Sequence, residues 1–264
     1  MNKRLRSSAL NPGPGFRIRT DFVRLESIAY RQLARFETPD ISDMLNRLYA
    51  VDSGIRLLTS PVHRLCGPVC TVKVFPGDNL MVHKVLDIAQ PGDIVAIDAS
   101  GSRMNAVIGD IICTKARHRG IQGFIVDGLI RDLPQIQELN FPVFARGETA
   151  IGPLHRGPGE INFPIALGGI VVNPGDVIVA DAAGIVAAPQ DIVAELIRRL
   201  KVHEASSREY IESVQRGEFS NAWVDDLLAE QNCAIETPEL VDPASSDMHD
   251  AMNQINPIES EEHA

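Results

Sequence analysis

The sequence predicts an α/β protein, because amphipathic helical segments alternate along the chain with short apolar runs of strand length. Its 264 residues are 44% hydrophobic and 23% charged, which is ordinary for a globular protein with a real core. One pattern occurs twice, at 90–101 and 173–184: a Pro-Gly turn, a four-residue apolar strand, then Asp and a Gly-ended turn. We expect these two segments to be equivalent strands in paired or stacked sheets.

The elements follow in chain order from local signals. A helix is predicted where apolar residues recur at helical spacing. Thr-Pro-Asp or Asp marks the start of such a helix, and Pro-Gly marks the end. A strand is predicted where a short apolar run is bounded by turn residues. The helices are expected at 21–36, 41–48, 78–88, 109–119 and 134–139, and from about 191 onward. The strands are expected at 66–75, 94–97, 123–126, 142–145, 169–172, 177–180 and 185–188.

The two ends of the chain differ from the middle. Residues 1–20 contain Asn-Pro-Gly-Pro-Gly, which is typical of an irregular, flexible arm. The segment 233–264 is rich in Asp and Glu, has interspersed prolines and lacks Lys and Arg, so we expect a flexible acidic tail. The folded body is therefore predicted to be a single domain of residues 21–232. A further hypothesis is that the tail covers a subunit surface.

Charge and cysteine content narrow the class of protein. A net charge of −10 disfavours binding to a nucleic-acid backbone. No apolar run is long enough to span a membrane, and no apolar region of a secretory signal follows the basic N-terminal residues. The four cysteines form no Cys-x-x-Cys pair and no zinc-type cluster, so reduced, mostly buried thiols in a cytoplasmic protein are expected.

The most informative feature is Asp110, followed after twenty residues by the pair Arg131-Asp132. Asp110 opens a helical segment, in Gly109-Asp110-Ile111-Ile112, whose start is ambiguous between Asn105 and Gly109. A start near Gly109 would leave the amides of 110–112 free to receive a substrate carboxylate. The alternative is that Asp110 only complements the helix dipole.

The pair Arg131-Asp132 has two interpretations as well. Asp132 precedes Leu133-Pro134, a pattern that can simply cap and begin a helix. Arg131 follows an apolar strand and an Asp127-Gly128 turn, and an Arg in that position commonly binds a planar anion. His83 and His155 each stand alone in the sequence, so they are interpreted as surface or satisfied histidines.

The arrangement Asp-x20-Arg-Asp resembles the signature of the metal-dependent 4-hydroxy-4-methyl-2-oxoglutarate/4-carboxy-4-hydroxy-2-oxoadipate aldolases and the RraA-like proteins. The resemblance covers roughly 25–220. It is also carried by the strings Asp78-Asn79-Leu80, Pro91-Gly92-Asp93, Gly123-Phe124-Ile125-Val126-Asp127-Gly128, Phe141-Pro142-Val143-Phe144-Ala145-Arg146-Gly147 and Pro174-Gly175-Asp176-Val177. It implies an α-β-β layered sandwich, assembled as a homotrimer or homohexamer with sites between subunits.

The same resemblance implies residue roles and an activity. Asp132 would hold Mg²⁺ or Mn²⁺ directly and Asp110 through water, while Arg131 and the backbone amides of Gly109 to Ile112 would bind the pyruvyl group. A glutamate from a neighbouring subunit would contribute, for which Glu209 is our assignment, with Glu204 and Glu212 left open. The implied reaction is retro-aldol cleavage of a hydroxy-oxo acid to pyruvate in the degradation of aromatic acids. Oxaloacetate decarboxylation is expected as a side activity, since it passes through the same enolate.

Two alternatives remain open at this point. One is a non-catalytic RraA-type regulator that binds a ribonuclease or another protein, because regulatory members can keep all three signature residues. The other is a class I aldolase that uses a Schiff-base lysine, although none of the lysines stands in an obvious site context. The lysines available are Lys3, Lys73, Lys84, Lys115 and Lys201.

Overall fold

The computed structural model describes residues 15–59 and 64–236. Contacts divide the chain into two compact units, one up to Glu209 and one from Tyr210 onward. The first unit contains the sheet and the candidate site, and the second contains α8 (Ala222–Glu230) and the last residues of α7 (Val193–Gln215). Most of the predicted arm and of the acidic tail lies outside the described residues. The hypothesis that the tail covers a subunit surface concerns those residues.

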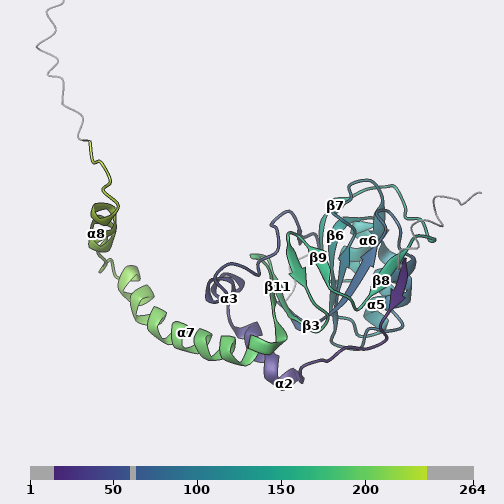
Figure 1. Cartoon of the computed structure of the whole chain (residues 1–264), viewed down its shortest axis with the longest axis horizontal. Helices are drawn as coiled ribbons and strands as arrows, with labels where there is room; N and C mark the ends of the chain where they lie inside the picture. Colours follow the sequence, from purple (N-terminus) through teal and green to yellow (C-terminus); the bar gives the residue numbers. More distant parts are fainter. Residues whose placement is uncertain (1–14, 60–63, 237–264) are drawn as a thin grey trace, which may run out of the picture. The chain divides into compact units, whose positions relative to one another are not determined.

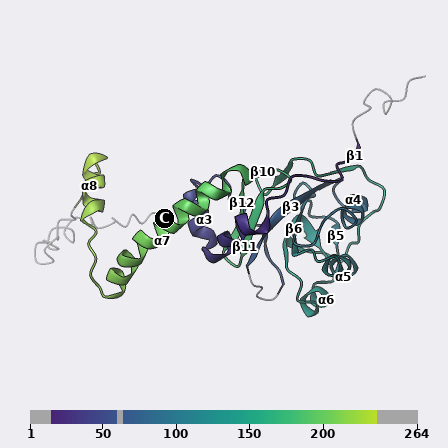
Figure 2. The same ribbon diagram turned by 90° about the horizontal axis from the view of Figure 1, so that it is seen from below.

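The first unit is layered, which confirms the α/β class and the expected α-β-β sandwich (Figures 1 and 2). Four neighbouring parallel strands form its centre: β3 (Leu65–Val74), β4 (Ile94–Asp98), β6 (Gly123–Ile130) and β7 (Val143–Glu148). One face of these strands packs against α4 (Leu80–Val85), α5 (Asp110–His118) and α6 (Leu133–Glu138). The other packs against β9 (Ile165–Leu167), β10 (Ile170–Val172), β11 (Val177–Asp181) and β12 (Gly184–Ala188).

A further group of helices covers the outer side of β11 and β12. It consists of α2 (Ser27–Tyr30), the 3₁₀ helix η1 (Arg31–Arg35), α3 (Thr38–Met44) and the first turns of α7, after the 3₁₀ turn η2 (Gln190–Ile192). Short strands complete the sheet: β1 (Phe16–Ile18), β2 (Arg56–Leu57), β5 (Ala106–Ile108) and β8 (Gly159–Ile161). The α-β-β layers are therefore followed by an additional group of helices on the outer side of β11 and β12.

Strand β4 shows why the central strands appear in the sequence as continuous apolar runs. Val95 and Ile97 belong to the core under α4 and α5, whereas Ile94 and Ala96 belong to the core under the second β layer. All four side chains are fully buried. Because side chains alternate between the two faces of a strand, a strand covered on both faces needs apolar residues at every position.

The repeated pattern predicted two equivalent strands, and the structure places both on β3. Strand β4 pairs with residues 69–73 of β3 in parallel, and β11 pairs with 65–68 in antiparallel fashion. In each copy the Asp of the Pro-Gly-Asp turn, Asp93 or Asp176, accepts a hydrogen bond of 2.8 Å from the backbone N–H three residues earlier. The repeat therefore marks the start of two strands, β4 and β11, that both pair with β3.

Two expectations about local structure were wrong. The helix expected over 21–36 is reduced to α2 and η1, because the guanidinium of Arg24 binds both carboxylate oxygens of Asp93 and holds the preceding segment against the sheet. The turn expected at Asp127-Gly128 lies inside β6, with a register shift between Val126 and Leu129. Asp127 accepts hydrogen bonds from Arg146 and from the amide of Gly168, so its carboxylate is structural.

The N-terminal residues also differ from the irregular arm expected over 1–20. Within that segment, Phe16–Ile18 form β1, which pairs in parallel with β8. The pairing is extended by hydrogen bonds from Gly159 N to Gly15 O and from Arg19 N to Ile161 O. Backbone pairing, rather than apolar spacing, therefore orders this short strand.

The thiols agree with the prediction for a reduced protein. Cys66, Cys70 and Cys113 are free and buried, and Cys233 is free and exposed. Burial raises the pKa of Cys66 to about 11 and that of Cys70 to about 12, so neither is a ready nucleophile. Among the described residues, no helix combines the length and the apolar character needed to cross a membrane.

Candidate functional site

The ends of two paired strands bring the signature residues together. Strand β5 pairs with the end of β6, with Ile108 opposite Ile130, and α5 begins immediately after β5. Arg131 follows β6 and donates its backbone N–H to Ile108 O at 3.1 Å. The helix start that the sequence left ambiguous therefore lies at Gly109, and Asp110 and Arg131 lie at the same edge of the sheet.

A pocket of about 280 Å³ opens at this edge. That volume is slightly below the roughly 300–1,000 Å³ typical of sites for drug-sized ligands, so it suits a small acid. Its lining includes all the predicted substrate-binding residues: Gly109, Asp110, Ile111, Ile112 and Arg131. The other lining residues are Asn79, His83, Ile108, Pro153 and His155.

Asp132 lies beside the pocket in a conformation that capping does not explain. It occupies the position before the first residue of α6, yet its side chain makes no capping hydrogen bond. Its backbone is left-handed, with φ at 60°, a region that costs free energy for a residue other than glycine. Its carboxylate is 35% exposed and lies 3.2 Å from Arg131 Nε. The carboxylate is therefore held beside the guanidinium and left available to a ligand.

The start of α5 presents backbone donors to the same pocket. The first amides of a helix have no intrahelical acceptor. Gly109, at the N-cap, has no side chain to cap them, and the Ile111 amide donates to Asp110 Oδ1 at 2.7 Å. The Ile111 amide is therefore taken by Asp110, and the amides of Asp110 and Ile112 are the first-turn donors left for the pocket.

Glycine at position 109 is required by the neighbouring side chains. A Cβ at this position would collide with Asp132 Oδ2 and would lie 3.2 Å from Arg131 Nε. We expect Gly109→Ala to lower the kcat/KM of the reaction proposed below by about 10- to 100-fold, because a displacement of roughly 1 Å misplaces both groups. Steady-state kinetics with a thermal unfolding control would measure this, and full activity in the variant would show that the packing here is not critical.

The structure also brings in two residues that were interpreted as isolated. His83 on α4 and His155 in the segment after β7 lie with their ring centroids 5.7 Å apart. His155 Nδ1 is 2.6 Å from Asn79 Oδ1. Burial lowers the pKa of His83, and the positive charge of Lys115 and the proximity of His155 lower it further. His155 is thus a satisfied histidine, as interpreted, whereas its contact with His83 is one that nothing in their sequence spacing indicates.

The remaining predicted residue stays outside this pocket. Glu209 is exposed on α7, as are Glu204 and Glu212, and none of them lines the pocket within this chain. The assignment of Glu209 to a neighbouring copy's site therefore stays a prediction. None of the described lysines lines the pocket either.

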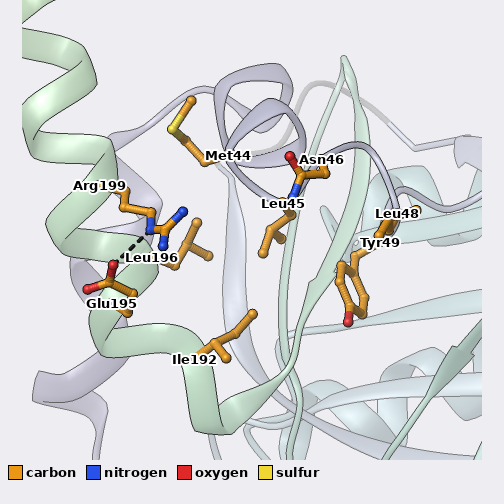
Figure 3. Close-up of a pocket in the computed structure, with 9 residues that line it drawn as sticks. All are labelled: Met44, Leu45, Asn46, Leu48, Tyr49, Ile192, Glu195, Leu196 and Arg199. Atoms are coloured by element: carbon orange, nitrogen blue, oxygen red, sulfur yellow. Dashed lines mark hydrogen bonds and ion pairs between the residues drawn. The ribbon is translucent and has the colours of Figure 1, made fainter.

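A second hollow lies between α3 and α7 (Figure 3). Its walls are mainly apolar, and its charged pair is Glu195 with Arg199, joined at 2.8 Å. Hydrogen bonds from Arg198 and Arg199 lower the pKa of Glu195 to about 2, so this carboxylate is already matched by two cations. The hollow contains none of the predicted site residues. The pocket at the start of α5 is therefore the candidate site.

Comparison with known proteins gives consistent matches. The family model described as RraA-like, Aldolase/RraA, matches residues 38–187. A Halalkalibacterium halodurans protein, provisionally named 4-hydroxy-4-methyl-2-oxoglutarate aldolase, is 40% identical over 66% of this chain and 82% of its own length. An Azotobacter vinelandii protein with the same provisional name is 30% identical over 60% of this chain and 97% of its own.

A solved structure shares the fold. It is that of Streptomyces coelicolor RraAS2, described as an unusual member of the RNase ES inhibitor RraA protein family. The two structures superpose with a TM-score of 0.66 at 28% identity, over 72% of this chain and 98% of the other. The relatives thus carry the names of both aldolases and ribonuclease inhibitors.

Proposed function

The chain belongs to the RraA-like aldolase family, and we propose that it is a cytoplasmic, divalent-metal-dependent (class II) pyruvate aldolase. It cleaves a 4-hydroxy-2-oxo di- or tricarboxylic acid to pyruvate and a second oxo acid, in the degradation of aromatic acids. The observation that carries the proposal is one pocket that joins Arg131 and the start of α5, with the Asp132 carboxylate adjacent. One small pocket thus combines hydrogen-bond donors for an anion with a carboxylate that could hold a cation, and this combination suits a 2-oxo acid.

The substrate's pyruvyl end is bound by groups of fixed geometry. The Arg131 guanidinium offers parallel N–H donors that match a planar carboxylate or 2-oxo acid. A Cβ on Gly152 would lie 2.6 Å from Arg131 Nη1, so this glycine leaves room for the guanidinium. The first-turn amides of α5 receive the substrate carboxylate, where the positive end of the helix dipole adds to the attraction.

The donors present fit a cation that keeps most of its water. Asp132 is partly exposed and has no capping role, and Asp110 lines the adjoining pocket. In the described part of the chain no cage of three or more His, Cys, Asp or Glu side chains forms, and Mg²⁺ commonly binds through one or two carboxylates and several waters. Asp132 would hold Mg²⁺ or Mn²⁺ directly and Asp110 through water, and the ion would supply Lewis-acid stabilisation of the developing enolate charge.

Asp110 and Arg131 have different roles in the proposed reaction. Retro-aldol cleavage removes the proton of the 4-hydroxyl and leaves negative charge on the pyruvate fragment. Asp110, at the pocket wall, accepts that proton through an intervening water. Arg131 provides a fixed positive partner for the charge on the pyruvate oxygen. A Schiff-base mechanism needs a lysine in the pocket, and none of the described lysines lines it, which favours the metal-dependent class.

The activity is tested by pyruvate release with and without a chelator. With Mg²⁺ we expect pyruvate from 4-carboxy-4-hydroxy-2-oxoadipate and, more slowly, from oxaloacetate, because both pass through the same enolate. EDTA should reduce both rates to background, and added Mg²⁺ or Mn²⁺ should restore them. Release of pyruvate from neither substrate would refute the proposal, and release that persists in EDTA would refute the metal dependence.

We propose further that the protein forms a homotrimer or homohexamer, in which Glu209 reaches the site of a neighbouring copy. Support comes from the exposure of Glu209 on α7, away from its own chain's pocket. If a site takes Asp132 from one copy and Glu209 from another, Asp132→Asn and Glu209→Gln chains should complement each other. After mixing and subunit exchange, about a quarter of the wild-type activity is expected, because a quarter of random sites are intact. No recovery after exchange would place both residues in one chain's site, and full activity of Glu209→Gln alone would remove Glu209 from the site.

A second candidate function is regulation by protein binding, favoured by the solved relative described as a ribonuclease inhibitor family member. Such a regulator would act through its surface and would need neither the pocket nor a cation. RNA cleavage by an RNase E-type enzyme, measured with and without the protein, separates the two cases. Inhibition that survives Arg131→Ala, without pyruvate release by the wild type, would favour the regulator.

A further inference from the structure

The candidate pocket is also lined by polar groups that the proposed chemistry does not use. The groups are Asn79, His83 and His155, and they share the pocket with Arg131 and Asp110. An arginine already matches the pyruvyl end of the substrate. Asn79, His83 and His155, the histidine group, are therefore available to a part of the ligand other than the 2-oxo acid.

The segments that carry the histidine group are held together by buried hydrogen bonds. Asp78 is 2% exposed and accepts hydrogen bonds from the backbone amides of Leu80, Arg156 and Gly157 at 2.7–2.8 Å. These bonds join the start of α4 to the segment that carries His155. The backbone adds a hydrogen bond from Asn79 N to Leu154 O at 2.9 Å. Such a connection fixes the positions of both imidazoles before a ligand arrives.

The side chain of Asn79 then orients His155. Asn79 is also only 2% exposed, and its Oδ1 lies 2.6 Å from His155 Nδ1. An imidazole whose Nδ1–H donates to the amide oxygen has its Nε2 free, and as an imidazolium it can donate from Nε2 to an anion. The second imidazole, His83, lies next to it. Arg131 and the two imidazoles line the same pocket, so it offers donors for more than one carboxylate of a bound acid.

We infer that His155 and His83, supported by Asn79, form the subsite for the second carboxylate of the substrate and so select dicarboxylic over monocarboxylic 2-oxo acids. The inference rests on the proposed function for its identification of the pyruvyl end. It assigns the two histidines a role in specificity rather than in the bond-breaking step.

The test compares two 2-oxo acids that differ in the distal carboxylate, 2-oxoglutarate and 2-oxopentanoate. Isothermal titration of the Mg²⁺-loaded full-length protein should show tighter binding of 2-oxoglutarate by roughly 10- to 100-fold, the range of a charge-assisted hydrogen bond. His155→Ala and His83→Leu should each reduce this ratio, His155→Ala to near one. His155→Lys, which also offers N–H donors to an anion, should restore part of it. His118→Ala, an exposed histidine at the end of α5, is the matched control and should leave the ratio unchanged.

The outcomes separate this inference from the proposed function. A wild-type protein that binds both acids equally, or binds neither, would overturn the inference. A folded His155→Ala variant with an unchanged ratio would overturn the role of His155, and an unchanged ratio in both histidine variants would overturn the subsite. A preference for 2-oxoglutarate that the variants lose, without pyruvate release from any hydroxy-oxo acid, would support the subsite and refute the aldolase.

Discussion

Replacement of Asp132 by Asn is expected to lower kcat/KM for pyruvate release by about 10³-fold or more, close to 4 kcal/mol of transition-state free energy. The side chain would keep its shape and lose the charge that is proposed to hold the cation. Asn also tolerates the left-handed backbone at this position, where φ is 60°, so the variant should fold normally. An alanine here would combine loss of the ligand with backbone strain and would be harder to interpret.

The measurement is a Mg²⁺ titration of pyruvate release, accompanied by direct metal binding in a calorimeter. Asp87→Asn is a suitable control, because Asp87 is an exposed carboxylate whose ion pairs with Lys84 and Arg119 lie on the surface and contribute little. Unchanged metal affinity in Asp132→Asn would remove Asp132 from the cation site. A loss of folding stability, on the other hand, would assign the carboxylate a structural role.

Replacement of Arg131 by Lys should reduce kcat/KM by about 10²- to 10³-fold even though the charge is kept. A lysine ammonium is a point charge and cannot bind a planar 2-oxo acid through two parallel donors. The guanidinium also lies 3.2 Å from Asp132 through Nε, a contact that lysine cannot reproduce with the same geometry. We therefore expect the Arg131→Lys variant to position both the substrate and the Asp132 carboxylate less accurately.

Comparison of Arg131→Lys with Arg131→Ala on 4-carboxy-4-hydroxy-2-oxoadipate and on oxaloacetate would measure this effect. If bidentate binding matters, the two variants should be similarly poor, and Arg103→Lys, at an exposed position, should behave as wild type. Activity close to wild type in Arg131→Lys would mean that only the charge is used.

Local signals in the sequence were sufficient for most of the central elements. The apolar run at 94–97 became β4, and Thr38-Pro39-Asp40 marked the start of α3. They failed where a distant contact decides the conformation. Arg24 binds Asp93, 69 residues away, and the segment around it is not helical. The Asp127-Gly128 pair has the composition of a turn, yet it lies inside β6, where Asp127 pairs with Asp98 of β4 and its carboxylate accepts hydrogen bonds from Arg146 and Gly168.

The candidate site, too, was predicted partly from local sequence and depends partly on tertiary structure. The sequence by itself predicted Asp110, Arg131 and Asp132 as site residues, from an Arg after a strand, an acidic helix start and the resemblance that their spacing carries. Only the tertiary structure placed the helix start at Gly109, left Asp132 without a capping bond and brought His83 to His155. Those features depend on strand pairing between β5 and β6 and on the hydrogen bonds of buried Asp78. Each joins residues far apart in the chain, so no local pattern could have encoded it.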